Sequence, residues 1–294
     1  MKMSLLPIAV VMVILLLSIS LAGAQETQTL TVFAAASLTD AFTEIGEAFA
    51  EAHPGVALMF NFGNSSALAT QLAEGAAADV FASANTRQME VAQAAGRIAE
   101  PVQIFARNQL VIAVPADNPA DIESLADLAN PGVLLVLAAP EVPVRVYTEA
   151  MLEALAAVPE YGEAYREAVL ANVVSEEETV RQVVAKIALG EADVGIVYQS
   201  DVTPDVADDV LAIEIPDEFN QIATYPIAAI SDSANPELAQ AFVAFVLSDA
   251  GQEIIVRWGF APRCPDDPEI EATPEVETAE TPAPEETPDA AGCE

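Results

Sequence analysis

The chain has 294 residues, with 46 acidic and 10 basic side chains and a formal net charge of −36 at pH 7. A protein that binds nucleic acid needs a positive surface to displace counterions, so this composition excludes nucleic acid as a partner. Two cysteines and a single histidine, His53, also leave no pattern of ligands for a structural metal ion.

The first 24 residues have the features of an export signal. One lysine precedes an apolar run at 5–21, and Ala22-Gly23-Ala24 matches the small-x-small pattern of a signal peptidase site. We expect residues 1–24 to be a signal peptide that is cleaved after Ala24. The apolar run is long for such a peptide, and a retained membrane anchor is the alternative.

Residues 264–294 differ in composition from the rest of the chain. They are rich in Pro, Glu, Thr and Ala, and they contain neither Lys nor Arg. Such a segment cannot bury enough apolar surface to offset the entropy lost on ordering, so we expect a disordered acidic tail. Cys264 and Cys293 bracket this tail, and the sequence leaves open whether they pair.

Apolar runs and helical periodicities alternate from the start of the mature chain. Strands are expected at 29–35, 56–62 and 79–83, and helices at about 38–49, 66–74 and 86–95. This order of elements predicts a mainly parallel sheet covered by helices.

A second set of elements has the same rhythm. Strands are expected at 110–114, 133–138, 172–174 and 194–198, with helices at 122–128, 147–157, 161–170 and 177–189. A strand at 226–230 and helices at 236–247 and 250–258 follow. We therefore predict two α/β lobes, one from 25–108 and 226–263 and the other from 109–225, joined by crossing segments near 107–110 and 224–226.

Two turns that carry hydroxyl groups follow successive strands of the first set. Ser37 lies where the first strand gives way to a helix, and Gly63-Asn64-Ser65-Ser66 lies at the next such junction. Helix N-termini attract anions, and ligands of open α/β sheets bind outside the carboxyl ends of the strands. The same residues could equally be ordinary helix caps and turn formers.

Tyr198 ends the apolar strand at 194–198, in the stretch Gly195-Ile196-Val197-Tyr198-Gln199-Ser200-Asp201. Its hydroxyl could extend into a cleft between the lobes, or the side chain could pack in the core. Asp201 could orient Tyr198 or simply begin a turn. An acidic protein that binds an anion does so against its own field, so hydroxyls, N–H groups and local dipoles are the expected donors.

Seven stretches between about residues 29 and 260 together resemble the periplasmic molybdate-binding protein family: TVFAAASLTDAF, NSSALATQL, ADVFASAN, APEVPVRVY, ETVRQVV, GIVYQSD and GQEIIVRWGF. The resemblance implies a two-lobe α/β fold like that of type II periplasmic binding proteins, each lobe a mainly parallel sheet flanked by helices. It also implies capture of molybdate or tungstate between the lobes and delivery to an ABC importer.

The resemblance implies further expectations about location, partners and cofactors. The protein is expected to act as a monomer in the periplasm or at the outer face of the cytoplasmic membrane. Its partner there is expected to be an ABC permease in the membrane. It is expected to need no cofactor, and to contact molybdenum only as molybdate.

Motif by motif, the resemblance also implies a ligand set. Ser37 and Ser65 would contribute a hydroxyl and an N–H group, Tyr198 its hydroxyl, and Val144 and Val180 an N–H group each. The valine side chains are expected to pack in the core. The pair Val144-Arg145 stands where the family commonly has a small pair such as Ala-Gly. We expect Arg145 and Arg181 to pair with surface acids rather than with the ion.

Such a set offers only donors, which suits molybdate because this dianion has only acceptor oxygens. Phosphate keeps a proton near neutral pH and favours a site that includes a carboxylate. Sulfate or another anion is the alternative ligand. An oxyanion sensor and a serine-dependent enzyme are less favoured alternatives. The sequence has no Gly-x-Ser-x-Gly motif to support catalysis, so we expect that the protein is not an enzyme.

Overall fold

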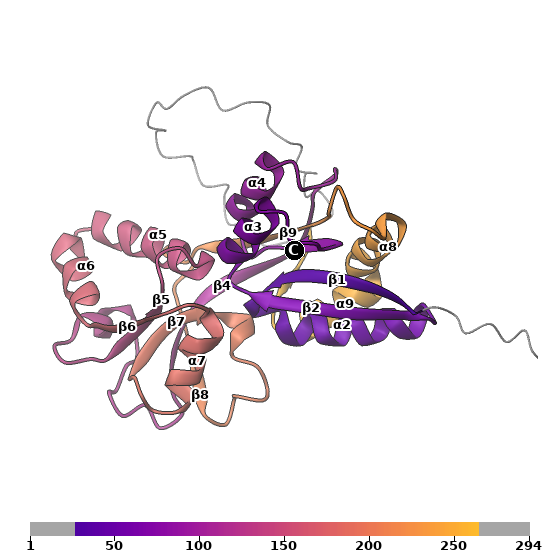
Figure 1. Cartoon of the computed structure of the whole chain (residues 1–294). Coiled ribbons are helices and arrows are strands. Elements are labelled where there is room, and N and C mark those ends of the chain that lie inside the picture. The colour runs from indigo at the N-terminus through magenta and orange to yellow at the C-terminus, as the bar shows by residue number, and fades with distance from the viewer. Residues whose placement is uncertain (1–26, 265–294) are drawn as a thin grey trace, which may run out of the picture.

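A computed structural model describes residues 27–264 of the chain (Figure 1). The expected signal peptide at 1–24 lies outside this range, as does the acidic tail from residue 265 onward. Pairing of Cys264 with Cys293 involves a residue outside it as well. These three expectations therefore stay predictions.

The N-terminal part of the structure is a parallel three-stranded unit. Strand β1 (Gln28–Ala35) lies between β2 (Val56–Gly63) and β3 (Val80–Ala82) and is parallel to both. A short 3-10 turn η1 (Ala36–Leu38) leads from β1 into α2 (Thr39–Ala52), and α3 (Ser65–Ala73) and α4 (Thr86–Ala94) follow β2 and β3.

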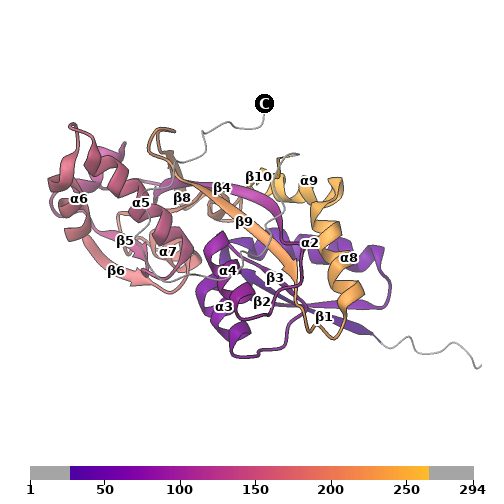
Figure 2. The ribbon, with the colours of Figure 1, turned by 90° about the horizontal axis from the view of Figure 1, so that it is seen from above.

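Alternating side chains of β1 pack on the two faces of this unit, because successive residues of a strand point to opposite sides. Val32 packs in the same cluster as Phe42 and Phe49 of α2. Phe33 packs instead with Leu68 of α3, in a second cluster that also includes residues of α4. The figures accordingly show α2 on one side of the strands and α3 and α4 on the other (Figures 1 and 2).

Two long strands link this unit to the rest of the sheet. Strand β9 (Ile222–Ala229) pairs antiparallel with β3 and with the first half of β4 (Gln103–Pro115). The second half of β4 pairs antiparallel with β7 (Val194–Tyr198) and β8 (Val210–Glu214). The predicted crossing segments pair with each other here, since Arg107 lies opposite Thr224 and Asn108 opposite Ala223.

The middle of the chain forms a second parallel unit. Strand β5 (Leu135–Ala138) lies between β6 (Val173–Glu177) and β7, parallel to both, so the sheet reads β2-β1-β3-β9-β4-β7-β5-β6. Helices α5 (Pro143–Ala157), α6 (Gly162–Ala171) and α7 (Val180–Ala188) connect these strands, with 3-10 turns η2 (Leu125–Ala129) and η3 (Gln199–Asp201).

The chain then returns to the first unit through α8 (Pro236–Leu247), α9 (Asp249–Arg257) and the two-residue strand β10 (Ala261–Pro262), which pairs with β4. Within residues 27–264 no single helix has the length and apolar composition of a membrane span. Helices α8 and α9 have this length and composition only when they are taken together, and a 61° bend separates them. Gly251 allows this bend, since a Cβ there would lie 2.3 Å from the Phe245 carbonyl oxygen.

The predicted α/β class is confirmed, and most elements lie within a few residues of their expected positions. Four differences concern chain segments of mixed polarity, and one is that β9 starts at Ile222 rather than 226. β4 starts at Gln103 rather than 110, because the polar side chains at 107–109 interrupt the apolar run. α5 starts at Pro143 rather than 147, since proline suits the first turn of a helix. The half-exposed strand β8 was not predicted. The lobe boundaries stay a prediction.

Candidate functional site

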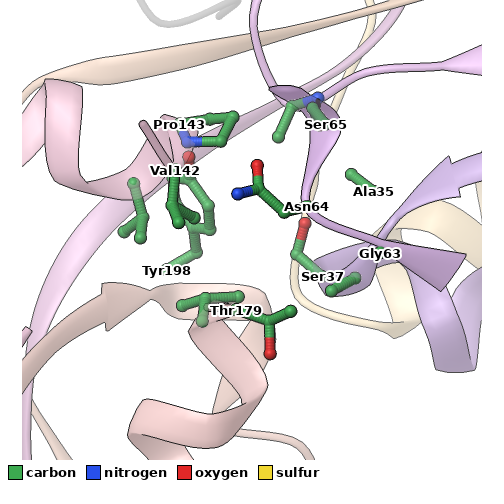
Figure 3. Close-up of a pocket in the computed structure, with 13 residues that line it drawn as sticks. Ala35, Ser37, Gly63, Asn64, Ser65, Val142, Pro143, Thr179 and Tyr198 are labelled. Carbon is green, nitrogen blue, oxygen red and sulfur yellow. Dashed lines mark hydrogen bonds between the residues drawn. The ribbon is translucent and has the colours of Figure 1, made fainter. Parts of the chain in front are cut away.

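A small cavity lies where the two parallel units meet. Its empty space, counted together with the solvent at its mouth, is about 230 Å³. Figure 3 shows it between two groups of side chains, one from the turns after β1 and β2 and one from the second unit. Thirteen residues line it: Ala35, Ala36, Ser37, Gly63, Asn64, Ser65, Ala84, Val142, Pro143, Val144, Thr179, Val180 and Tyr198.

The structure brings all five predicted site residues to this cavity. Ser37 and Ser65 meet because β1 and β2 are in parallel register, with Ala35 opposite Gly63 at their carboxyl ends. Each serine is therefore the second residue beyond the same point of the sheet edge. Both are almost fully buried, at 5% and 1% exposure.

Val144 and Val180 approach from the second unit as first-turn residues of two helices. Val144 follows Pro143 at the start of α5, and Val180 opens α7 directly after the cap Thr179. The first N–H groups of a helix have no carbonyl one turn earlier, so they are available to a ligand. Both side chains belong to the hydrophobic core, as expected. These backbone groups also bring the positive ends of two helix dipoles to the cavity.

The Ser65 hydroxyl oxygen accepts a hydrogen bond from the protein, and the Ser37 hydroxyl oxygen can accept one. The Ser65 Oγ atom accepts the N–H of Ala84 at 3.1 Å. The Ser37 Oγ atom lies 3.0 Å from the Tyr225 hydroxyl, which accepts Nδ2 of Asn108 at 3.5 Å and so can donate its proton to the serine. Both serine protons are then free to point into the cavity.

Tyr198 carries an unsatisfied donor. Its hydroxyl is buried, and within residues 27–264 no group forms a hydrogen bond of normal distance and angle with it. Burial raises the pKa of this phenol well above its usual value, and the neighbouring Tyr225 adds to the effect. The hydroxyl therefore stays protonated. Leaving such a group unpaired costs free energy, so a buried phenol without a partner at a cavity indicates a missing acceptor.

Asp201 follows Tyr198 by three residues and contacts its backbone. Its Oδ2 atom accepts the backbone N–H of Tyr198 at 3.1 Å, whereas its buried Oδ1 atom has no partner within the described residues. The aspartate thus holds the main chain of Tyr198 rather than its phenol. Burial raises the pKa of Asp201 to about 7, against smaller lowering effects of the Tyr198 N–H and of Arg181.

The thirteen lining residues include no Lys, Arg, Asp or Glu. Arg145 is held by Glu149, Glu176 and the carbonyl oxygen of Ala138. The prediction that this arginine pairs with acids is confirmed.

Arg181 is also paired with an acid, as predicted. Its Nη1 atom lies 2.6 Å from Oδ2 of Asp40, a contact between α7 and α2. Among residues 27–264, no group of three or more His, Cys, Asp or Glu side chains is placed to hold a metal ion.

A family model described as bacterial extracellular solute-binding protein matches residues 30–261. The chain belongs to this family. The description of the family names solute binding outside the cell, so the chain is a solute-binding protein. The matched range covers every element from β1 to β10 apart from the first residues of β1 and the last residue of β10.

Relatives of this solute-binding protein confirm the resemblance read from its motifs. The molybdate-binding protein ModA of Mycobacterium tuberculosis is 42% identical over 237 residues, which cover 81% of this chain and 86% of the relative. The protein of that name from Escherichia coli is 32% identical and is covered to 88% of its length, with 79% of this chain matched.

Solved structures show the same fold. A substrate-binding domain assigned to a molybdenum ABC transporter of Clostridium difficile is 29% identical, with a TM-score of 0.61 over 80% of this chain and 99% of that one. The sulfate-binding protein SubI of Mycobacterium tuberculosis has a TM-score of 0.70 at 21% identity, covering 81% of this chain and 88% of that one. At this identity the likeness shows the fold alone.

Sequence reasoning missed two residues of this solute-binding protein that matter to the cavity. Asn64 was read only as a turn former, yet it lines the cavity. Tyr225 was read as part of a crossing segment, yet it holds Ser37. The dipeptide Tyr225-Pro226 carries no local signal for this contact, because its partner lies 188 residues earlier.

Proposed function

We propose that this chain captures molybdate or tungstate outside the cytoplasmic membrane and delivers it to an ABC importer. The observation that carries the proposal is the buried, unpartnered hydroxyl of Tyr198 at a small cavity lined by neutral donors. The Tyr198 hydroxyl lacks an acceptor there, and a tetrahedral dianion supplies four acceptor oxygens.

The proposed ligand set is that implied by the resemblance. Ser37 and Ser65 donate through hydroxyl and N–H, Tyr198 through its hydroxyl, and Val144 and Val180 through N–H. A donor-only set favours an oxyanion that is fully deprotonated near neutral pH, because a proton on the ligand would face another donor. This reasoning disfavours phosphate and leaves sulfate as the competing ligand.

The names of the relatives support the remaining parts of the proposal. Two are called molybdate-binding proteins, and one solved domain is assigned to a molybdenum ABC transporter. We accordingly infer an ABC permease as partner and a location in the periplasm or at the outer face of the cytoplasmic membrane. A monomeric state and no cofactor complete the proposal. Closure of the two lobes about β4 and β9 would enclose the dehydrated ion.

Isothermal titration calorimetry of the mature protein with molybdate, tungstate, sulfate and phosphate tests the ligand. We expect tight one-to-one binding of molybdate and tungstate, weaker binding of sulfate, and no measurable binding of phosphate. Tight sulfate binding together with weak molybdate binding would reassign the ligand, and failure of all four anions to bind would overturn the proposal.

A further inference from the structure

The side chain of Asn64 has two ends with different surroundings. Its Oδ1 atom accepts the backbone N–H of Ser66 at 3.0 Å and the hydroxyl of Ser66 at 3.1 Å, which caps α3. Two donors at this atom identify it as the amide oxygen, since hydrogen-bond partners decide the orientation of an asparagine side chain. The Nδ2 atom must therefore face the opposite direction.

That opposite direction is the cavity. Figure 3 shows the Asn64 amide in the middle of the pocket, with its nitrogen turned toward Val142 and Tyr198 and its oxygen turned away from them. The side chain extends from the turn after β2 toward the second unit. Within the described residues, no hydrogen bond from Nδ2 accompanies the two that Oδ1 accepts. The cap thus holds two N–H donors in place inside the cavity.

We infer that Asn64 is a further donor to the bound oxyanion, which it contacts through Nδ2 from the side of the first unit. The inference rests on the proposed function, since it names an additional contact at the same site. Asn64 then has two roles. Its oxygen caps α3 by accepting the Ser66 N–H, and its nitrogen adds an uncharged donor beside Ser65.

The variant Asn64→Asp distinguishes the role of Asn64 as a ligand from its role as a helix cap. Aspartate has nearly the same shape and is an equally good cap, so α3 should form normally. It replaces the cavity-facing donor with a carboxylate oxygen that repels a dianion. We expect the dissociation constant for molybdate to rise by about 100-fold or more, as for loss of a hydrogen bond to a charged group together with added repulsion.

Two further variants complete the design. Asn64→Ser keeps an oxygen for the cap and removes the amide donor without adding charge, so about a 10-fold weakening is expected. Asn61→Asp adds the same charge on β2 at a side chain that contacts Gln71 and does not line the cavity. This control should bind molybdate within about 2-fold of the unmodified protein, because exposed charges are screened by salt.

Calorimetry with molybdate and thermal unfolding of the ligand-free proteins give the readouts. The inference holds if both Asn64 variants weaken binding while their unfolding temperatures stay close to that of the unmodified protein. It is overturned if Asn64→Ser binds normally, or if Asn61→Asp weakens binding as much as Asn64→Asp. Failure of the unmodified protein to bind any oxyanion would instead remove the proposed function itself.

Discussion

The hydroxyl oxygens of Ser37 and Tyr225 lie 3.0 Å apart, although the two residues are 188 positions apart in the chain. Ser37 stands at the cavity after β1, and Tyr225 lies on β9, one of the two strands that link the parallel units. Asn108 of β4, the other linking strand, donates to the same tyrosine hydroxyl at 3.5 Å. Both linking strands therefore reach a candidate ligand residue through one phenol.

This relationship predicts the effect of Tyr225→Phe. The variant removes the group that fixes the Ser37 hydroxyl, so molybdate binding should weaken by roughly 1 to 1.5 kcal/mol, about a 10-fold change. Tyr147→Phe is the matched control, because its hydroxyl accepts the Thr224 N–H at 3.4 Å and does not line the cavity. Calorimetry that ranks the two variants equally would contradict the role of Tyr225.

Tyr198→Phe should change affinity and stability in opposite directions. Its hydroxyl is buried without a partner in the ligand-free protein, so its removal should leave the free energy of unfolding unchanged or raise it by about 1 kcal/mol. Binding of molybdate should weaken by roughly 1.5–3 kcal/mol, since the lost hydrogen bond is to a charged group. Urea unfolding and calorimetry check the pair of effects, and unchanged affinity would contradict a contact with the ion.

Ser65→Ala should lower both the free energy of unfolding and the affinity for molybdate. The Ala84 N–H loses its acceptor inside the protein, which should cost about 1–3 kcal/mol of unfolding free energy. The lost donor should also weaken molybdate binding by roughly 1.5–3 kcal/mol. Comparison with Tyr198→Phe by the same two methods distinguishes a hydroxyl that holds protein and ligand from one that holds ligand alone. Full stability of Ser65→Ala would speak against the Ala84 contact.

Arg181→Gln should have little effect on affinity. The guanidinium is partly exposed and pairs with Asp40 outside the cavity lining, and such pairs contribute at most about 1 kcal/mol. The dissociation constant for molybdate should therefore change by less than about 5-fold. A loss as large as that of Ser37→Ala, measured side by side, would mean that the arginine reaches the ion.

Asp201 should make stability depend on pH. Its pKa of about 7 lies above the ordinary value of 3.8, so between these values the folded protein holds a proton that the unfolded chain has released. Stability from this group therefore falls as pH rises through that window, by roughly 4 kcal/mol at most, and the loss is complete above pH 7. Asp201→Asn should remove this dependence.

Urea unfolding of the unmodified protein and of Asp201→Asn, each at about pH 5 and about pH 8, provides the measurement. Other titrating groups are shared by both proteins, so the difference between them isolates Asp201. The asparagine variant should gain stability relative to the unmodified protein as pH rises. Equal pH dependence in the two proteins would contradict a raised pKa.

The strand-helix junctions of the site could be predicted from local patterns. Ser37 and Ser65 each follow an apolar strand and precede a helix, and parallel pairing of β1 with β2 then brings them together. The sequence predicts the start of α5 four residues late, because Val142-Pro143-Val144-Arg145 shows no alternation of apolar and polar faces. Arg145 looks like a surface residue in this pattern, but it is buried. Its N-terminal N–H groups were found through the family motif instead.

Contacts between segments distant in sequence could not be predicted in this way. The contact of Tyr225 with Ser37 depends on β9 lying beside β3 and β4, which local periodicity does not determine. The direction of the Asn64 amide depends on which of its atoms the Ser66 donors select. Both features follow from three-dimensional hydrogen bonding rather than from the pattern of apolar residues.

The neutral lining of the cavity also bears on the rate of capture. No lysine or arginine among the lining residues attracts a dianion from a distance, and the whole chain carries a formal charge of −36. Long-range repulsion should therefore slow the encounter, and added salt, which screens it, should speed association. A site built on a basic patch would behave in the opposite way. Recognition here would begin only at contact distance, where hydroxyl and amide dipoles exceed the repulsive field.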